Sequence, residues 1–186
     1  QVVAADFLWR FRSGPFATNL SSSRAIEDVA ARYGEEVFRS AVGEINVVKK
    51  MQEVGAILGG EGNGGVILPE LHYGRDGLVG TAMVLQHLVN EGVSMTDVRA
   101  DLPRYHIVKQ KTKIGSLDPD ALLARMADHY RNERISTIDG VKIDFDEGWV
   151  HMRRSNTEPI IRVYSEAASE DRARELGQRF MSELVG

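Results

Sequence analysis

Residues 56–68 read Ala-Ile-Leu-Gly-Gly-Glu-Gly-Asn-Gly-Gly-Val-Ile-Leu, a glycine-rich segment between two short apolar runs. The apolar runs predict two strands that this segment connects. Glycine permits a tight backbone path close to a ligand, and only Glu61 and Asn63 project side chains from the loop. A carboxylate beside a carboxamide can accept and donate hydrogen bonds, which suits vicinal sugar hydroxyls. A flexible hairpin that binds nothing is the alternative interpretation.

Strands and helices alternate on both sides of this loop. The predicted elements are a strand at 17–20, a helix at 26–33, a strand at 36–41, a helix at 45–55 and a helix from Asp76 to Gly92. We expect the inward face of the last helix to comprise Leu78, Ala82, Leu85 and Leu88 or Val89. His87 and His129 are expected at surface or boundary positions. The alternation predicts an α/β domain with a largely parallel sheet.

A domain boundary is predicted where Pro103 ends a short helix over 96–102, because proline cannot continue a helix. The two predicted domains are 1–101 and 102–186. In the second, the predicted elements are a strand at 105–111, a helix from Asp118, a hairpin around 146–148, a strand at 160–165 and a helix from Ser169. This order predicts a small α+β domain in which two helices cover an antiparallel sheet.

The segment Arg153-Arg154-Ser155-Asn156-Thr157-Glu158-Pro159, followed by Arg162, lies between two predicted strands. Its hydroxyl and amide groups offer several donors, and arginine makes forked hydrogen bonds that match phosphate oxygens. The segment therefore favours an anion site. A polar turn that caps its own backbone, with solvated arginines, is the alternative.

Glu44, with Lys49 and Lys50, forms a third and weaker candidate at the start of a helix. A glutamate there is usually a partner of the helix dipole, and two lysines usually form a solvated face. The five histidines show no metal-ligand spacing, so no metal site is predicted. No Gly-x-Ser-x-Gly motif indicates a hydrolase.

The composition narrows the function classes. A net charge of −4 gives no overall basic field for nucleic acid, and no apolar run is long enough for a membrane span. The chain has no cysteine, which excludes disulfides and thiolate chemistry and fits a cytoplasmic protein. The first residues lack an initiator Met and a signal-peptide pattern, and they suggest a chain cut from a longer one.

Residues 153–163 resemble the phosphate-binding loop of the phosphoglucomutase/phosphomannomutase superfamily, the α-D-phosphohexomutases. Residues 60–65 resemble the sugar-recognition loop of that family's third domain. Segments at 42–44, 74–77 and 102–105 also resemble family segments. The resemblance runs in order over nearly the whole chain.

The resemblance implies roles for particular residues. Glu61 and Asn63 would bind sugar hydroxyls, and Glu44 could assist proton transfer. The implied phosphate-binding residues are Arg153, Ser155, Asn156, Thr157 and Arg162. Asn63 stands where many members have Ser, and Gly65 where many have His, so the preferred epimer stays open. Asn156 favours glucose or mannose phosphate, because phosphoglucosamine mutases usually have Gly there.

Members of this family have four domains. The first carries a phosphorylated serine and the second a loop that holds Mg²⁺, and neither motif occurs here. We therefore expect this chain to be the third domain, lacking its first strand or helix, and the fourth. Its partners would be a small-molecule phosphosugar and the missing N-terminal domains. Mg²⁺ and a hexose 1,6-bisphosphate are expected for the full enzyme, and neither for this fragment, which alone should be inactive.

The implied activity is interconversion of hexose 1-phosphate and hexose 6-phosphate through a bisphosphate. A phosphoglucosamine mutase, a non-catalytic phosphosugar-binding module and a protein–protein module with purely structural loops are the alternatives.

Overall fold

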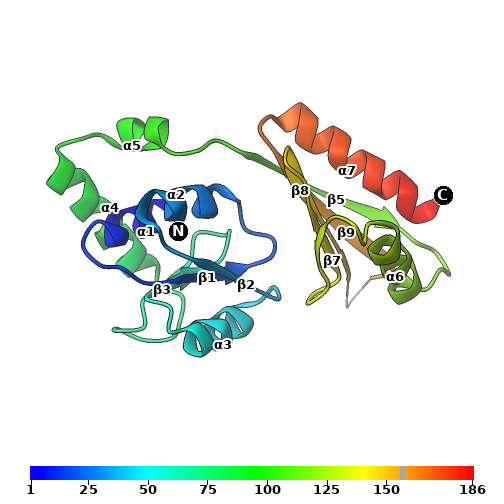
Figure 1. Ribbon diagram of the computed structural model, residues 1–186, viewed down its shortest axis with the longest axis horizontal. Helices are drawn as coiled ribbons and strands as arrows, with labels where there is room; N and C mark the ends of the chain where they lie inside the picture. Colours follow the sequence, from blue (N-terminus) through cyan, green and yellow to red (C-terminus); the bar gives the residue numbers. More distant parts are fainter. Residues whose placement is uncertain (156–157) are drawn as a thin grey trace. The chain divides into compact units, whose positions relative to one another are not determined.

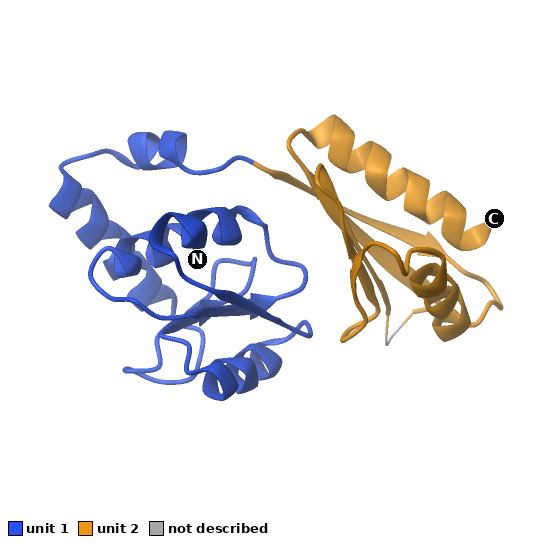
Figure 2. Cartoon of the chain, viewed as in Figure 1, with its two compact units in different colours: residues 1–104 blue, residues 105–186 orange. Residues whose placement is uncertain are grey.

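The computed structural model describes residues 1–155 and 158–186. The chain divides into two compact units, residues 1–104 and residues 105–186 (Figure 2). The division follows Arg104, whereas the boundary expected from the sequence follows Asp101. The mixed α/β fold class expected from the sequence is confirmed in both units.

Unit 1 contains a four-stranded sheet in the order β2-β1-β3-β4. The strands are β1 (Phe16–Asn19), β2 (Val37–Ser40), β3 (Leu58–Gly60) and β4 (Val66–Ile67). β1 pairs in parallel with both β2 and β3, and β4 returns antiparallel to β3. The sheet is therefore largely parallel, as the alternation of elements predicts.

Helices lie on both faces of this sheet (Figure 1). One face packs against α1 (Val2–Trp9), α2 (Ala25–Tyr33) and α4 (Gly77–Glu91), and α5 (Met95–Asp101) adds Val98 to the same apolar cluster. The other face packs against α3 (Glu44–Val54), whose Val47 and Met51 are fully buried. Unit 1 is thus a three-layer α/β/α arrangement.

Several helix ends follow the sequence signals. Gly34 and Gly55 end α2 and α3 in the left-handed conformation, with φ of 71° and 65°. The Asp76 side chain accepts hydrogen bonds from the N–H groups of Leu78 and Val79 at the start of α4. Helix α1 was not predicted, because Gln1 makes no capping hydrogen bond and the first turn has no acidic residue.

The inward face predicted for α4 is largely wrong, although Leu88 does pack against the core. Leu78, Leu85 and Val89 are 82%, 57% and 75% exposed, and Ala82 is also exposed. The buried residues are instead Met83 and His87. His87 was expected near the surface but is only 2% exposed, because it packs against α1 with Nε2 3.6 Å from Asp6 Oδ2.

Unit 2 contains a five-stranded antiparallel sheet in the order β5-β9-β8-β7-β6. The strands are β5 (His106–Lys113), β6 (Arg134–Ser136), β7 (Val141–Asp144), β8 (Gly148–Arg154) and β9 (Ile160–Ala167). Two helices, α6 (Pro119–His129) and α7 (Glu170–Val185), cover one face (Figure 1). β6 was not predicted; the rest agrees with the expected α+β domain.

Side chains alternate between the two faces of this sheet. Val150, Met152, Ile161 and Val163 form a core with α6 and α7. Their sequence neighbours therefore lie on the opposite face, which we call the helix-free face. Its members on the four strands β5, β9, β8 and β7 include Lys109, Lys111, Lys113, Arg162, Tyr164, His151, Arg153 and Lys142.

Candidate functional site

The glycine-rich loop of unit 1 holds Glu61 directly after β3. Glu61 N donates to Gly65 O at 3.3 Å, and Gly64 N donates to Glu61 O at 3.1 Å, so the loop turns tightly. A Cβ at residue 60 would lie 2.4 Å from Gly65 O, which is why this close approach requires glycine. The loop leaves Glu61 only 6% exposed.

Two hydrogen bonds and one ion pair hold the Glu61 carboxylate. Oε1 accepts from Asn19 Nδ2 at 2.8 Å and from Gly43 N at 3.1 Å. Oε2 lies 3.4 Å from Arg75 Nη1. Asn19 ends β1 and Glu61 follows β3, so the carboxyl ends of two adjacent parallel strands bring them together. Ligands of open α/β sheets bind at this edge.

Arg75 joins Glu61 to Glu44. Its Nε donates to Glu44 Oε2 at 2.8 Å and its backbone N donates to Glu44 Oε1 at 3.0 Å. These hydrogen bonds lower the pKa of Glu44. A Cβ at residue 65 would lie 2.5 Å from Arg75 Cδ, so the glycine at 65 leaves room for the arginine. The sequence pointed to the segment 74–77 by resemblance, but not to this role of Arg75.

Asn63, the second candidate on the loop, is exposed. Its Oδ1 accepts from Gly65 N at 3.2 Å, which is the local capping expected of a polar turn. The two N–H donors of its Nδ2 are not used in this turn. If Asn63 binds a sugar, as predicted, it would therefore do so through these two N–H donors.

A partly buried arginine supports the backbone at Asn19. Arg39 on β2 donates through Nη1 to Asn19 O at 2.9 Å and to Ser22 O at 2.8 Å. Its Nε and Nη2 also bind the Glu27 carboxylate at 2.7 and 2.8 Å. This polar frame was missed, because it joins residues from β2, α2 and the turn after β1 that only the folded sheet brings together.

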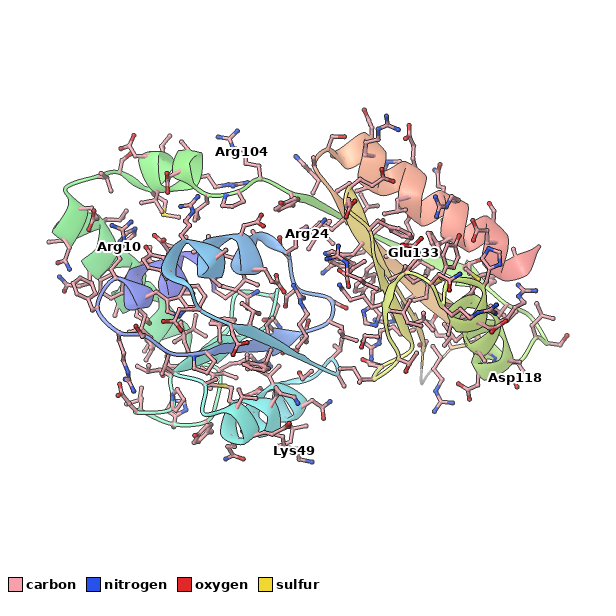
Figure 3. All side chains as sticks on the ribbon, in the orientation of Figure 1. Arg10, Arg24, Lys49, Arg104, Asp118 and Glu133 are labelled. Atoms are coloured by element: carbon pink, nitrogen blue, oxygen red, sulfur yellow. The ribbon has the colours of Figure 1, made fainter. Side chains whose placement is uncertain are left out.

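The two lysines next to Glu44 form a surface face. Lys49 is exposed on the outer side of α3 (Figure 3), and Lys50 pairs with Glu53 at 2.8 Å. The structure therefore groups Glu44 with Arg75 rather than with these lysines.

In unit 2, the hairpin of β8 and β9 places the two predicted arginines side by side. Arg153 lies directly opposite Arg162 in the strand register, and Arg162 lies directly opposite Lys111 of β5. Directly opposed residues share one face of a sheet. A row of three basic side chains therefore crosses the helix-free face. Sequence reasoning missed Lys111, because its place in the row depends on the β5–β9 register.

The row has little opposing charge. Arg153 Nε lies 3.5 Å from Asp139 Oδ2 but has no hydrogen-bond acceptor within the described part of the chain, although it is buried. For the side chains of Arg162 and Lys111, the described residues provide no ion pair. Like charges directly opposed across strands are destabilising. The arrangement thus suits an anionic ligand that would neutralise it.

Arg154 differs from Arg153. It lies on the opposite face and donates from Nη1 to Asp120 Oδ2, at the start of α6, at 2.9 Å. One of the two arginines at the start of the motif is therefore already paired.

A hollow of about 340 Å³ opens beside the row. Its lining comprises Lys109, Gln110, Lys111, Glu158, Ile160, Arg162 and Tyr164. Ser155 closes the hairpin through a hydrogen bond from its N–H to Ile160 O at 3.0 Å. Asn156 and Thr157, the other two predicted phosphate-binding residues, lie outside the described residues.

Within residues 1–155 and 158–186, no group of three or more His, Asp or Glu side chains is arranged to hold a metal ion. No helix in the same ranges is both long enough and apolar enough to cross a membrane.

Sequence comparison finds two relatives that span most of this chain. The phosphoglucomutase/phosphomannomutase of Thermococcus kodakarensis is 39% identical over 99% of the chain and 41% of its own length. The phosphoglucosamine/phosphogalactosamine mutase of Sulfurisphaera tokodaii is 35% identical over 86% of the chain and 36% of its own length. The chain thus spans about 40% of the length of curated relatives that it matches.

A solved structure shows the same fold. The phosphoglucomutase/phosphomannomutase family protein of Burkholderia thailandensis superposes with a TM-score of 0.80, at 23% identity, over 98% of this chain and 40% of that one. Residues 2–105 match the family described as phosphoglucomutase/phosphomannomutase, alpha/beta/alpha domain III, and residues 107–183 match its C-terminal domain. The chain therefore belongs to the phosphoglucomutase/phosphomannomutase family and comprises the region of domain III and the C-terminal domain.

Proposed function

We propose that this chain is the C-terminal part of a phosphohexose mutase, in which unit 2 binds the phosphate of a hexose phosphate and unit 1 binds sugar hydroxyls. The full-length enzyme would interconvert hexose 1-phosphate and hexose 6-phosphate through a bisphosphate intermediate. This part supplies binding and positioning, which account for much of catalysis in phosphoryl transfer.

The observation that carries the proposal is the row of Lys111, Arg162 and Arg153 on one face of the unit 2 sheet. A phosphate dianion needs converging donors and compensating charge, and forked arginine donors match its oxygens. We include Ser155, Asn156 and Thr157 in this site because the family motif contains them. Lys111 is added from the strand register.

In unit 1, Glu61 is the proposed acceptor for sugar hydroxyls, and Asn63 the proposed donor. Two hydrogen bonds and an ion pair hold Glu61 before any ligand arrives, which reduces the entropy lost on binding. Glu44 is held by Arg75, and its lowered pKa keeps it ionised. That pairing favours a role in fixing Arg75, and proton transfer by Glu44 stays a prediction.

The remaining chemistry would come from the rest of the full-length protein. A phosphorylated serine and Mg²⁺, together with a hexose 1,6-bisphosphate, belong to this proposal through the family resemblance. A bound Mg²⁺ would stabilise charge on the transferring phosphoryl group. We expect a cytoplasmic location and no activity from this chain alone.

A phosphoglucosamine mutase is the second candidate, because the Sulfurisphaera tokodaii relative carries that name. The two candidates differ at C2 of the sugar, where one substrate has a hydroxyl and the other an ammonium group. Assays of the full-length protein with glucose 1-phosphate and with glucosamine 1-phosphate would separate them. Turnover of the glucosamine ester alone would favour the second candidate.

Titration calorimetry with glucose 6-phosphate tests the phosphate site on this chain. We expect Arg153→Ala to weaken binding by about 2–3 kcal/mol, because it removes a charge-assisted hydrogen bond. Arg154→Ala is the matched control, since Arg154 is adjacent in sequence but paired with Asp120 on the other face. Equal affinities for the wild type and Arg153→Ala would contradict the proposal.

A further inference from the structure

Helix α4 carries an apolar stripe on its outer side. Leu78, Leu85 and Val89 are 82%, 57% and 75% exposed, and Ala82 lies between the first two and is exposed as well. These positions follow one another at intervals of four, three and four residues. Such spacing places them in one line along a helix.

The other exposed residues of α4 are almost all uncharged. The exposed neighbours Thr81, Gln86 and Asn90 are neutral, and Glu91 is the only acidic or basic residue other than histidine in the fifteen residues of α4. Glu91 is itself paired with Arg10, the residue that follows α1, at 2.9 Å. A helix face made for water usually carries charged residues, so this face has the composition of a contact surface.

Helix α7 of the same chain shows what a water-facing helix looks like here. Its outer side carries three ion pairs within the helix: Arg174–Glu170 at 2.7 Å, Arg172–Glu175 at 3.1 Å and Arg179–Glu183 at 3.3 Å. Its inward apolar residues Ala173, Leu176, Phe180 and Leu184 are buried, and Val185 at its C-terminal end is exposed. α4, by contrast, has apolar residues on both sides, although only one side packs against the core of unit 1.

The inner side of α4 already accounts for its packing in unit 1. Met83 is buried in the core, Val79 and Leu88 pack against that core, and His87 contacts Asp6. A Cβ added at Gly80 would lie 3.1 Å from Val66 Cγ2, so the helix is seated closely on β4. The stripe is therefore not needed to fold unit 1.

We propose that the α4 stripe is the surface on which unit 1 binds the remaining part of its full-length protein. The chain spans only 41% of the Thermococcus kodakarensis relative, and its first matched region is numbered domain III of the family. A relative of full length therefore has further domains that could cover this surface.

The size of the stripe favours an occupant within the same polypeptide. Four side chains along one helix give much less area than the roughly 800 Å² per partner of a stable complex between separate proteins. Covalent linkage gives a high effective concentration, so a small apolar contact is sufficient between domains of one chain. A second copy of this chain would lack that advantage.

Carbene footprinting, read out by mass spectrometry, tests this directly by measuring side-chain exposure. The chain alone is compared with a fusion in which the rest of the Thermococcus kodakarensis relative precedes Gln1. We expect labelling of Leu78 and Leu85 to fall about fivefold in the fusion, because interface cores are packed as tightly as protein interiors. Val185 of α7, which is 48% exposed, should be labelled equally in both.

Two charge variants complete the test. In the fusion, Leu85→Glu with Val89→Glu should restore Leu78 labelling to the level of the chain alone. Gln178→Glu with Ser182→Glu, at the same spacing on the exposed side of α7, should leave the protection intact. Both pairs should leave the melting temperature of the chain alone nearly unchanged.

Three results would overturn the proposal. The first is labelling of Leu78 and Leu85 that is as strong in the fusion as in the chain alone. The chain alone could protect the stripe in proportion to its concentration, which would identify a second copy as the occupant. Leu85→Glu with Val89→Glu could unfold the chain alone, which would make the stripe part of the core. Each readout is independent of mutase activity.

Discussion

The two proposed binding regions, one in each unit, are built in opposite ways. In unit 1, the negative charge of Glu61 is matched by Asn19, Gly43 and Arg75, so the carboxylate is held without a ligand. In unit 2, Arg162 and Arg153 lie side by side and little within the described residues opposes their charge. A buried charge is stable only when it is paired, and like charges repel across strands. The Glu61 carboxylate of unit 1 is therefore held in place without a ligand, whereas we propose that the basic row of unit 2 is completed by an anion.

The largest expected effect is a loss of stability of unit 2 in acid, because burial on the helix-free face opposes protonation of His151. Burial, assisted by Arg153 and Lys142, lowers the pKa of His151 to about 4, although Asp139 opposes the shift. An unfolded chain holds this proton below about pH 6.5, so it binds more protons than the folded chain between pH 6.5 and 4. The free energy of unfolding of unit 2 should fall by about 3 kcal/mol across that window.

Each unit contains one of the two tryptophans, so the free energy of unfolding of each unit can be measured separately. In a Trp9→Phe background, urea unfolding followed by Trp149 fluorescence reports on unit 2. The same series with His151→Gln, which can still donate to Asp139 O, should lose most of the acid sensitivity. An identical pH dependence in both would show that His151 is not the cause.

The next effect tests whether Glu61 is needed for the fold of unit 1. Glu61→Ala leaves the donors of Asn19 and Gly43 without their acceptor and removes the partner of Arg75. We expect unit 1 to lose about 2–3 kcal/mol of stability, the usual consequence of unpairing buried polar groups. Urea unfolding followed by Trp9 fluorescence, in a Trp149→Phe background, measures it.

Asn63→Ala is the matched control, because Asn63 is on the same loop but exposed. Its effect should stay within about 0.5 kcal/mol, as for most surface substitutions. If Glu61→Ala were equally mild, Glu61 would not be a structural part of a preformed site.

The smallest expected effect is a gain in stability rather than a loss. Without ligand, Arg162→Ala should stabilise unit 2 by about 0.5 kcal/mol, because it removes a like charge between Arg153 and Lys111. With saturating glucose 6-phosphate, the wild type should become the more stable protein, since a ligand stabilises the form that binds it. Thermal unfolding with and without the ester gives both values, and a destabilised ligand-free variant would remove the contrast between the units.

Local signals in the sequence were sufficient for most elements. Gly34 and Gly55 end α2 and α3, Asp76 begins α4, and the loop at 59–65 joins two strands, all as predicted. Helix α1 lacks such signals and was missed. The inward face of α4 was assigned wrongly because apolar residues occur on both of its sides, and spacing alone does not show which side packs against the core.

Long-range partners could not be predicted in the same way. The two arginines at 153 and 162 share a face only because of the hairpin register. Lys111 joins them from an edge strand that lies far from them in the sequence, and Asn19 and Arg75 reach Glu61 across the sheet of unit 1. Sequence reasoning thus identifies the loops, but not the residues that support them.

Amide NMR spectra during a titration with glucose 6-phosphate test the central claim most directly. We predict changes in amide chemical shift for the described residues of the β8–β9 hairpin and for Lys111. These changes should persist in Arg154→Ala and disappear when both Arg153 and Arg162 are replaced by alanine. Spectra in which those amides stay unchanged at saturating ester, or move equally in the double variant, would contradict the assignment of this basic row as the phosphate site.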